Sequence, residues 1–509
     1  MPPYHRQRDL PPWRAVAAHG ALPLQRSVLK TVAVGSSNSF DLVVLGGGTG
    51  GYSAAFRAAQ MGLRTALVEE ARIGGTCLHR GCIPTKAMLE SADLYARIRD
   101  AAAFGLTVGE TGVEMGVIAA RRAQVVDRLT KGLMSLVKKN KVEFVAGHGV
   151  LESATTVRVA LNGEDGTPGA GGERLLDATD VILATGSRVK SLPGLVPDGT
   201  RIVTSDDVLH SDTLPKSIVV VGAGAVGVEF ASFYRDMGAR VTLLEYLPSV
   251  VPLEDAEVGQ VLERAFKRRG IDVMTNARFD PAAVTVDADG VTLTVGPEGG
   301  KPVELRAEQL LVATGRAANV EGIGLEKTRA VVERGIVQVD GRMRTAEPHL
   351  YAIGDVVGGL LLAHVAAHEG ITAVETILGL EPEPIDYAKM PRATYCRPQV
   401  ASIGRSEEEL RRDGVPFKVG KFPWMANGKA IIGGEYDGFA KVLAHAETDR
   451  VLGVHLVGPH VTDLVAEASV GIFLEATAWE LGAAVHPHPT LSEAIGEAAM
   501  AVAGRSINY

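Results

Sequence analysis

The sequence is poor in cysteine. Only three cysteines occur among 509 residues, which is far below the density of a secreted scaffold held together by disulfide bonds. A reducing, intracellular and most simply cytoplasmic location is therefore expected. Two of the three, Cys77 and Cys82, lie five residues apart, and such a pair in a reducing compartment indicates redox catalysis or metal binding more than a structural bridge.

Long apolar runs and runs of basic residues are also missing. Apolar stretches such as Ile218 to Val221 fall far short of the ~20 residues that span a bilayer. The formal net charge is -8, whereas affinity for nucleic acid comes mainly from Lys and Arg that neutralise phosphates. Neither nucleic acid nor a membrane is expected as a partner.

The length predicts several domains behind a distinct leader. Hydrophobic cores stop growing at about 250 to 300 residues, so 509 residues predict three or four domains. Residues 1–38 contain five basic residues and one acidic residue, and they form no domain pattern. A transit peptide to an organelle matrix, a disordered tail and a start codon placed too far upstream all remain open for this segment.

A complete dinucleotide-binding pattern begins at Asp41. A short apolar strand leads into Gly46-Gly-Gly-Thr-Gly-Gly51, a helical stretch runs through Met61, and a second strand ends in Glu69. The glycines of this G-x-G-x-x-G turn let a pyrophosphate approach the backbone amides at the helix N-terminus. Glu69 is placed to accept hydrogen bonds from a ribose.

The same pattern returns at Ile218. A strand, the turn Gly222-Ala-Gly-Ala-Val-Gly227, a helix through Met237 and a strand ending before Glu245 follow in the same order. One fingerprint is weak evidence, because glycine-rich turns also occur for structural reasons, but two complete copies predict two dinucleotide sites. A flavin and a nicotinamide are the economical pair for moving hydride. The acid at Glu245 favours a free ribose 2'-hydroxyl, and hence NAD over NADP.

A further repeat supports two doubly wound units of an α/β fold. The segments 181–186 and 311–315 each end a buried strand at an Ala-Thr-Gly turn, where backbone can approach a cofactor. The glycine- and proline-rich stretches 162–172 and 287–302 are flanked by alternating Val, Thr and Leu, so they are predicted to be connections in small antiparallel sheets.

The cysteine pair directly follows the first dinucleotide unit. It lies in Gly74-Gly-Thr-Cys-Leu-His-Arg-Gly-Cys-Ile-Pro-Thr-Lys86. Residues five apart in a regular helix lie beyond the roughly 7 Å Cα limit for a disulfide, so we expect Gly81 and Pro84 to distort the turn and let the cysteines pair. A zinc site lacks a second pair of ligands nearby. A redox function is predicted.

These residues resemble the class I pyridine nucleotide-disulfide oxidoreductases. The Cys-x-x-x-Gly-Cys-x-Pro-x-Lys motif, the Ala-Thr-Gly turns, Tyr351-Ala-Ile-Gly-Asp355 and the tail from His486 to Glu493 carry the resemblance, which runs from Phe40 almost to the end. It implies two Rossmann-like FAD- and NAD-binding domains, with the NAD domain inserted in the FAD domain, and a C-terminal α+β dimerisation domain. The implied boundaries are 39–187 (FAD), 188–315 (NAD), 316–387 (a central domain completing the FAD site) and 388–509 (interface).

Within that family the chain is most similar to the branch that oxidises protein-bound dihydrolipoamide and reduces NAD+. Cys-Ile-Pro-Thr-Lys, Glu245, the segment 422–427 and the His-Pro-Thr-Leu-Ser-Glu tail are typical of it. Mercuric and thioredoxin reductases would need extra C-terminal cysteines, and glutathione reductases would show basic residues around Glu245. The implied partners are a second copy of the chain and a lipoyl-domain-bearing acyltransferase or glycine cleavage carrier protein.

The resemblance also implies roles for single residues. The FAD site would comprise Gly46, Gly48, Gly51, Glu69, Lys86, Gly149 in a Gly147-His148-Gly149 turn, Thr185, Gly186, Asp355, Leu361, Leu362, Ala363 and His364. The NAD site would comprise Gly222, Gly224, Gly227, Glu229, Glu245 and Gly315, and Lys86 would pair with Glu229 beside the flavin. Substrate would attack Cys77, and the Cys82 thiolate would face the flavin.

The catalytic base is predicted to be His488. Glu493 follows at a spacing that places a carboxylate on the other imidazole nitrogen, which selects the tautomer and stabilises the charged ring. His486 is expected to be a bystander.

Two departures from the family pattern concern substrate choice more than reaction class. His79-Arg80 replaces the more usual Asn-Val, and Tyr395-Cys-Arg397 stands where Tyr-Thr is common. Cys396 is expected to be a small buried hydrophobic residue. An NAD-linked reductase of another low-molecular-weight disulfide and a noncatalytic flavoprotein scaffold remain the alternatives.

Overall fold

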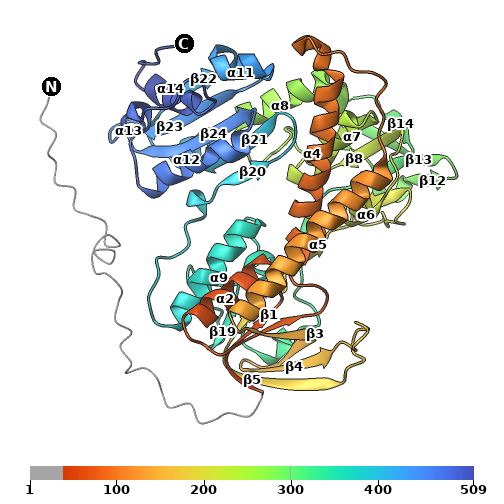
Figure 1. Cartoon of the computed structure of the whole chain (residues 1–509), viewed down its shortest axis with the longest axis vertical. Coiled ribbons are helices and arrows are strands. Elements are labelled where there is room, and N and C mark those ends of the chain that lie inside the picture. Colours follow the sequence, from red (N-terminus) through yellow and green to blue (C-terminus); the bar gives the residue numbers. More distant parts are fainter. Residues whose placement is uncertain (1–37, 298–299) are drawn as a thin grey trace, which may run out of the picture. The chain divides into compact units, whose positions relative to one another are not determined.

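The computed structural model describes residues 38–297 and 300–509 (Figure 1). Residues Phe40–Tyr509 form one compact unit. The three interpretations of the leader fall on residues 1–37 and so lie outside the described residues. Among the described residues, no helix combines the length with the hydropathy that a bilayer-spanning segment needs.

The first sheet has six strands and contains the first fingerprint. Its order is β1-β2-β3-β4-β5-β19, and β1 also pairs with β5. The strands are β1 (Ser39–Leu45), β2 (Thr65–Glu69), β3 (Glu143–Ser153), β4 (Thr156–Leu161), β5 (Glu173–Leu183) and β19 (Leu350–Ala352). The pairs β1–β2, β2–β3 and β5–β19 are parallel, whereas β3–β4 and β4–β5 are antiparallel, with 162–172 as the predicted connection.

Helices pack on this sheet and carry the cysteines. Helices α2 (Thr49–Gln60) and α9 (Ala363–Ile377) lie side by side (Figure 1). They approach so closely that a Cβ at Gly370 would lie 2.8 Å from the backbone oxygen of Gly50. The absence of a side chain at Gly370 therefore permits this packing. Helices α3 (Gly75–His79), α4 (Cys82–Arg99) and α5 (Met115–Lys139) follow β2.

The second sheet is parallel throughout, with order β10-β9-β8-β15-β7. Its strands are β7 (Ile202–Thr204), β8 (Ser217–Val221), β9 (Arg240–Leu244), β10 (Ile271–Met274) and β15 (Gln309–Val312), and its helices are α6 (Ser205–His210), α7 (Ala225–Asp236) and α8 (Ala256–Arg268). Because all its strands lie between β5 and β19 in sequence, the second unit is inserted in the first, as predicted. The chain enters and leaves it through a two-stranded ribbon of β6 (Ser187–Val189) and β16 (Arg316–Ala318).

An antiparallel insertion follows β10. It consists of β11 (Ala277–Arg278), β12 (Thr285–Asp287), β13 (Gly290–Pro297) and β14 (Val303–Ala307). The prediction of one connection over 287–302 is therefore wrong in part, because residues 290–297 form a strand. Its alternating Val291, Leu293 and Val295 point into a buried cluster, which outweighs the turn-forming glycines at either end.

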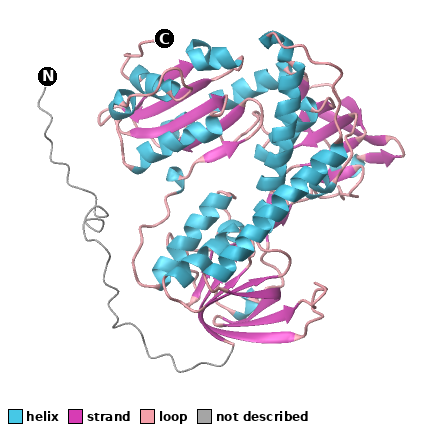
Figure 2. Cartoon of the chain, in the orientation of Figure 1, coloured by secondary structure: helices cyan, strands magenta, loops and turns pink. Residues whose placement is uncertain are grey.

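The third sheet is antiparallel and C-terminal, with order β20-β21-β24-β23-β22. Its strands are β20 (Arg392–Thr394), β21 (Gln399–Gly404), β22 (Phe417–Pro423), β23 (Phe439–His445) and β24 (Val451–Gly458). Its helices are α10 (Glu407–Arg412), α11 (Gly428–Gly433), α12 (Val461–Phe473), α13 (Ala478–Ala483) and α14 (Glu493–Ala501). Figure 2 shows how the strands separate into distinct sheets accompanied by helices.

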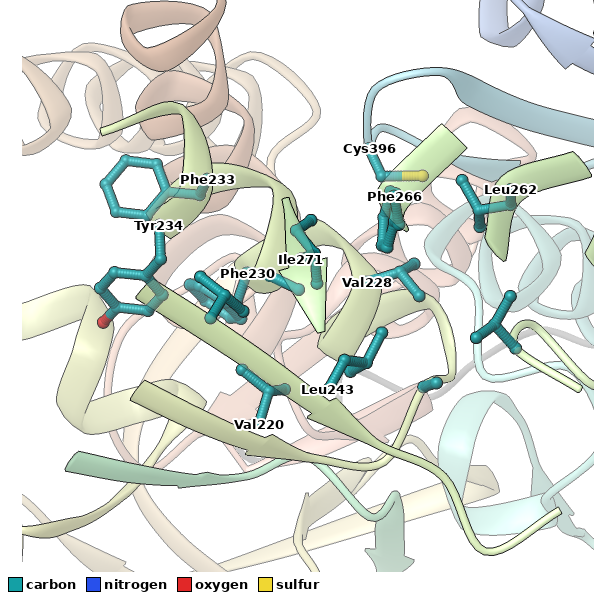
Figure 3. Packing of buried hydrophobic residues seen from close by; sticks show 14 of the residues in the cluster. Val220, Val228, Phe230, Phe233, Tyr234, Leu243, Leu262, Phe266, Ile271 and Cys396 are labelled. Carbon is teal, nitrogen blue, oxygen red and sulfur yellow. The ribbon is translucent and has the colours of Figure 1, made fainter. Parts of the chain in front are cut away.

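The largest core cluster lies around α7 (Figure 3). Val220 and Leu243 of the second sheet pack beneath Val228 and Phe230 of α7. Cys396, which follows β20, is 1% exposed and belongs to the same cluster. The expectation that Cys396 is a small buried hydrophobic residue is confirmed, and burial raises the pKa of its thiol.

Candidate functional site: a dithiol between two dinucleotide folds

The two cysteines lie on either side of a helix break. Cys77 is in α3, which ends at His79, and Cys82 is the first residue of α4. Gly81 precedes α4 with φ -149° and ψ -116°, outside helical geometry, so the distortion predicted there is present. Pro84 does not cause it, because it lies buried in the first turn of α4, where a proline needs no amide donor.

The pair is present as two free thiols rather than as the predicted disulfide. The hydrogen bond from Cys77 lowers the pKa of Cys82 to about 7, assisted by the positive charge of Lys86 and opposed by burial. The same bond, together with burial, raises the pKa of Cys77, although a hydrogen bond from Thr49 acts in the opposite direction. Cys82 is thus the thiol that ionises first.

Lys86 joins the redox helix to the second unit. Its Nζ lies 2.8 Å from both carboxylate oxygens of Glu229 on α7, so the predicted pair is confirmed. Glu229 also accepts a hydrogen bond from the Tyr395 backbone amide at 2.9 Å, and the ammonium lies 4.7 Å from the centre of the Tyr395 ring. Burial acts to lower the pKa of Lys86, but the Glu229 carboxylate outweighs it and the pKa is raised.

The acids that end the two fingerprints make equivalent contacts. Glu69 accepts hydrogen bonds from the backbone amides of Gly47 (2.7 Å) and Ala71 (2.8 Å). Glu245 accepts them from Ala223 (2.6 Å) and Leu247 (2.8 Å). Each carboxylate therefore fixes its own glycine turn, and each oxygen keeps a lone pair for a ribose hydroxyl.

The glycines of each fingerprint differ in their surroundings. A Cβ at Gly51 or Gly227 would lie 1.8 Å from the backbone oxygen of Gly46 or Gly222, so no side chain fits at the third glycine. A Cβ at Gly48 or Gly224, which precede α2 and α7, would meet no atom within 4 Å. The space beside the second glycine is open, as the approach of a pyrophosphate requires.

A cavity of about 890 Å³ lies over the second fingerprint. Gly222, Gly224, Glu245 and Gly315 line it, as predicted for a nicotinamide nucleotide. Gly227 and Glu229, predicted for the same site, are not among the described residues that line it. Gly227 is buried under its turn, and Glu229 is engaged by Lys86.

Leu361 and Leu362, predicted to hold FAD, line the cavity over the second fingerprint. They precede α9, whose first residue is Ala363. His364 is exposed, and its Nε2 lies 2.7 Å from the Pro391 backbone oxygen. Leu361 and Leu362 therefore lie beside the second fingerprint, whereas Ala363 and His364 are not among the described residues that line its cavity.

Asp355 follows the C-terminal end of β19 and lies in a polar network. It accepts a hydrogen bond from Ser187 Oγ and lies 3.7 Å from Arg316 Nε. Arg316 donates to Ser187 Oγ at 2.6 Å and to Thr76 Oγ1, beside Cys77, at 3.4 Å. Arg316 thus links the Asp355 turn to the redox helix, a role that sequence reasoning missed although Arg316 directly follows the second Ala-Thr-Gly turn.

The expected turn at 147–149 is wrong. Gly147 and Gly149 lie within β3, where each pairs with β4. A Cβ at Gly149 would lie 2.4 Å from Leu45 Cδ1, so the glycine serves the packing of β3 against β1. Thr185 and Gly186 lie in the link between β5 and β6: Thr185 Oγ1 donates to the Asn319 backbone oxygen at 2.8 Å, and Gly186 has φ +70°.

The predicted base and its partner are in contact near the C-terminus. His488 Nδ1 lies 2.8 Å from Glu493 Oε1, and Glu493 Oε2 accepts from the Thr490 amide at 2.7 Å. Burial acts to raise the pKa of Glu493, but these two hydrogen bonds outweigh it and the pKa is lowered. The His486 side chain, by contrast, is only 12% exposed. Its Nε2 lies 2.7 Å from Glu467 Oε1.

The unusual residues between the cysteines have defined contacts. His79 Nε2 lies 2.8 Å from the Ile73 backbone oxygen, and burial lowers the pKa of His79. Arg80 lies 3.7 Å from Asp206 of α6. Both side chains are therefore held by neighbouring segments. Thr49, inside the first fingerprint, is a further contact of Cys77 that the sequence analysis missed.

Comparisons with known proteins agree with this geometry. Residues 40–370 match the family described as pyridine nucleotide-disulphide oxidoreductase, and residues 390–499 match its dimerisation domain. A protein from Bacillus subtilis named dihydrolipoyl dehydrogenase is 46% identical over 475 residues, which cover 93% of this chain and 100% of the relative. A protein of the same name from Zymomonas mobilis is 43% identical over 474 residues, again 93% of this chain and 100% of the relative.

A solved structure shares the whole fold. The crystal structure of LpdA from Mycobacterium tuberculosis superposes with a TM-score of 0.82 at 31% identity and covers 90% of this chain and 98% of that one. The sequence matches extend over both dinucleotide folds, the dithiol and the C-terminal sheet. The chain belongs to the pyridine nucleotide-disulphide oxidoreductase family.

Proposed function

We propose that the chain is a dihydrolipoyl dehydrogenase, which oxidises protein-bound dihydrolipoamide to lipoamide and reduces NAD+. The observation that carries the proposal is the pair of free cysteines Cys77 and Cys82, placed between two dinucleotide folds and beside the Lys86–Glu229 ion pair. The Bacillus subtilis and Zymomonas mobilis relatives support the choice of substrate, since both are named dihydrolipoyl dehydrogenase and both match this chain over their full length.

The residues present suit FAD at the first fold and NAD at the second. The first fold offers the open space at Gly48 and the carboxylate of Glu69, and the second offers Gly224 and Glu245 at a cavity of about 890 Å³. When bound, FAD would supply the two-electron relay that accepts electrons from the dithiol and passes them to NAD+ as hydride. On the FAD side we propose Gly46, Gly48, Gly51, Glu69, Lys86, Thr185, Gly186 and Asp355. On the NAD side we propose Gly222, Gly224, Glu245, Gly315, Leu361 and Leu362.

The cysteines and the base divide the thiol chemistry. Starting from the oxidised pair, His488 accepts a proton from one thiol of dihydrolipoamide, and the resulting thiolate attacks Cys77 Sγ. The Cys77–Cys82 bond breaks, and Cys82 leaves as a thiolate, a departure that its low pKa favours. The second thiol of the substrate then displaces Cys77 from the mixed disulfide and closes lipoamide; its proton ends on the Cys77 sulfur, while His488 keeps the first proton. The enzyme is left as a dithiol with Cys82 ionised.

The active site is proposed to be shared between two copies of the chain. The dimerisation domain over 390–499 supports a homodimer. The base is in this domain, and the side chain of His488 is 79% exposed in the single chain. A two-fold dimer in which His488 of one chain meets Cys77 of the other would use this surface twice.

Mixed dimers test this arrangement. One copy carries Cys77→Ser and the other His488→Ala, with different tags. If sites are shared, one site collects both defects and the other is intact, so about half the normal activity returns when the sites act independently. A mixed dimer no more active than its parents would contradict sharing.

Steady-state assays test the reaction itself. Dihydrolipoamide with NAD+ should be turned over far better than glutathione or other small thiols, and Cys77→Ser should abolish this while NADH still reduces an artificial dye. Preference for another disulfide would favour the alternative reductase, and flavin that NADH cannot reduce would favour a noncatalytic scaffold. The lipoyl-domain partners and a cytoplasmic location remain proposals, supported by the relatives' names and by the three cysteines in 509 residues.

A further inference from the structure

The segment Val251–Glu254, here called the strap, forms one wall of the cavity over the second fingerprint. The Val251 backbone amide donates to the Ala223 oxygen at 2.8 Å, inside the fingerprint turn. Val251 has φ +43°, a left-handed conformation that a β-branched residue rarely adopts. The strap is thus tied to the nucleotide turn in a conformation that the surrounding structure must enforce.

The other end of the strap is held by the C-terminal sheet. Glu254 is 7% exposed at its side chain and accepts from Arg392 Nε at 3.0 Å and from Ser402 Oγ. Arg392 on β20 and Ser402 on β21 are direct cross-strand partners, and Arg392 Nε also lies 3.1 Å from Ser402 Oγ. The three side chains form one polar unit that spans two parts of the fold.

Asp255, the residue after Glu254, also forms an ion pair with the C-terminal sheet, and this pair is more deeply buried. Asp255 accepts from Lys441 Nζ of β23 at 2.9 and 3.1 Å, and both side chains are 0% exposed. Asp255 also caps α8, which lies beside β24 (Figure 1). Two consecutive carboxylates therefore bind two cations of the C-terminal sheet at the point where the strap ends.

Arg392 belongs to the cavity wall as well. It lines the cavity together with Ala393 and Thr394, so the strap and β20 are two walls of the same space. The ion pair between Glu254 and Arg392 joins these walls directly. The pair thus spans the cavity from one wall to the other.

We propose that Glu254 and Arg392 are positioning residues that hold the strap and β20 around the bound nicotinamide nucleotide and thereby set its affinity. This inference rests on the proposed use of NAD+. Breaking a buried pair leaves an uncompensated charge, which the strap can relieve only by moving. The loss should therefore fall on nucleotide binding and not on the thiol half of the reaction.

The test uses the holoenzyme with the variants Arg392→Met, Arg392→Lys and Glu254→Gln. Arg174→Met is the matched control, since it removes a partly buried ion pair with Glu143 on the first sheet. NAD+ binding to the oxidised enzyme is measured by calorimetry, and the reduction of bound flavin by dihydrolipoamide is followed without NAD+. We expect Arg392→Met and Glu254→Gln to weaken NAD+ binding about tenfold, with flavin reduction by dihydrolipoamide within about twofold of normal.

Arg392→Lys should recover part of the loss, because a lysine keeps the charge but not the fork geometry of arginine. Unchanged NAD+ affinity in Arg392→Met and Glu254→Gln would overturn the inference, and so would a control variant that loses as much. The calorimetry needs no turnover. A chain that binds NAD+ but does not oxidise dihydrolipoamide would therefore refute the proposed function and leave this test intact.

Discussion

His488 Nδ1 lies 2.8 Å from Glu493 Oε1, while 79% of the His488 side chain is exposed. The carboxylate thus fixes the tautomer that leaves Nε2 unprotonated, and that nitrogen faces away from its partner. The exposed ring is oriented before any substrate arrives. Such an orientation suits a base that acts on thiols outside its own domain.

Replacing Glu493 should weaken the base without touching the nucleotide sites. Glu493→Gln keeps the size and an acceptor oxygen but removes the negative charge that stabilises the imidazolium. We expect kcat for dihydrolipoamide oxidation to fall, by less than the roughly 10²- to 10⁴-fold loss expected for His488→Ala. Reduction of a dye by NADH should stay normal in both. An equal loss of dye reduction would contradict the assignment.

The low pKa of Cys82 should depend on a donor at residue 77. The hydrogen bond from Cys77 is the largest cause of the fall to about 7. Cys77→Ala removes the donor and should raise the pKa of Cys82 towards the ordinary value, whereas Cys77→Ser keeps a hydroxyl donor and should raise it less. The pH dependence of alkylation by iodoacetamide, with the cysteine identified by mass spectrometry, measures this. Identical profiles for Ala and Ser would exclude the hydrogen bond as the cause.

Substitutions of the fingerprint glycines should separate folding from binding. Gly227→Ala places a methyl group 1.8 Å from a backbone oxygen, so it should lower the melting temperature as well as NAD+ affinity. Gly224→Ala meets no protein atom within 4 Å, so the melting temperature should stay near normal while NAD+ affinity falls. The pair Gly51→Ala and Gly48→Ala should behave likewise for FAD. Equal melting temperatures for Gly224→Ala and Gly227→Ala would contradict this distinction.

Much of this architecture can be predicted from the sequence, because short patterns of neighbouring residues determine it. The strand, glycine turn, helix and terminal acid at Glu69 and Glu245 follow from spacing alone, and the structure adds that each acid binds the turn it follows. The Lys86–Glu229 pair, 143 residues apart, was accessible only through resemblance, because spacing says nothing about which helices of two units meet.

Other features depend on tertiary packing that no local pattern encodes. Gly149 suggests a turn in sequence, yet its absent side chain makes room for Leu45 within β3. Leu361 lines the cavity over the second fingerprint, which follows from where the segment before α9 packs and not from any local pattern. Arg316 and Arg392 take part through contacts with residues more than 100 positions away.

Glu245 should make the enzyme prefer NAD+ to NADP+. Its two oxygens are fixed by backbone amides and line the cavity, so a ribose 2'-hydroxyl can donate to the carboxylate whereas a 2'-phosphate would be repelled. The measurement is kcat/KM for each nucleotide at saturating dihydrolipoamide. Comparable values for the two nucleotides would refute this role.

Glu369 should make the stability of the protein depend on pH. Its side chain is buried in α9, where Oε2 accepts from the Gly354 amide at 2.6 Å and Oε1 from the Tyr387 hydroxyl at 2.8 Å. Burial raises the pKa of Glu369 to about 7, although the two hydrogen bonds lower it. Between the ordinary pKa of 4.5 and about 7 the folded state therefore binds more protons than the unfolded state.

The contribution of Glu369 to stability should consequently fall as the pH rises through this window. Glu369→Gln cannot ionise, so its free energy of unfolding should improve relative to the unmodified protein between about pH 5 and about pH 8. Tyr387→Phe removes a hydrogen bond that lowers the pKa, so it should move the window upward. Urea denaturation at several pH values measures all three proteins. A constant difference between Glu369→Gln and the unmodified protein across this range would show that Glu369 does not titrate there.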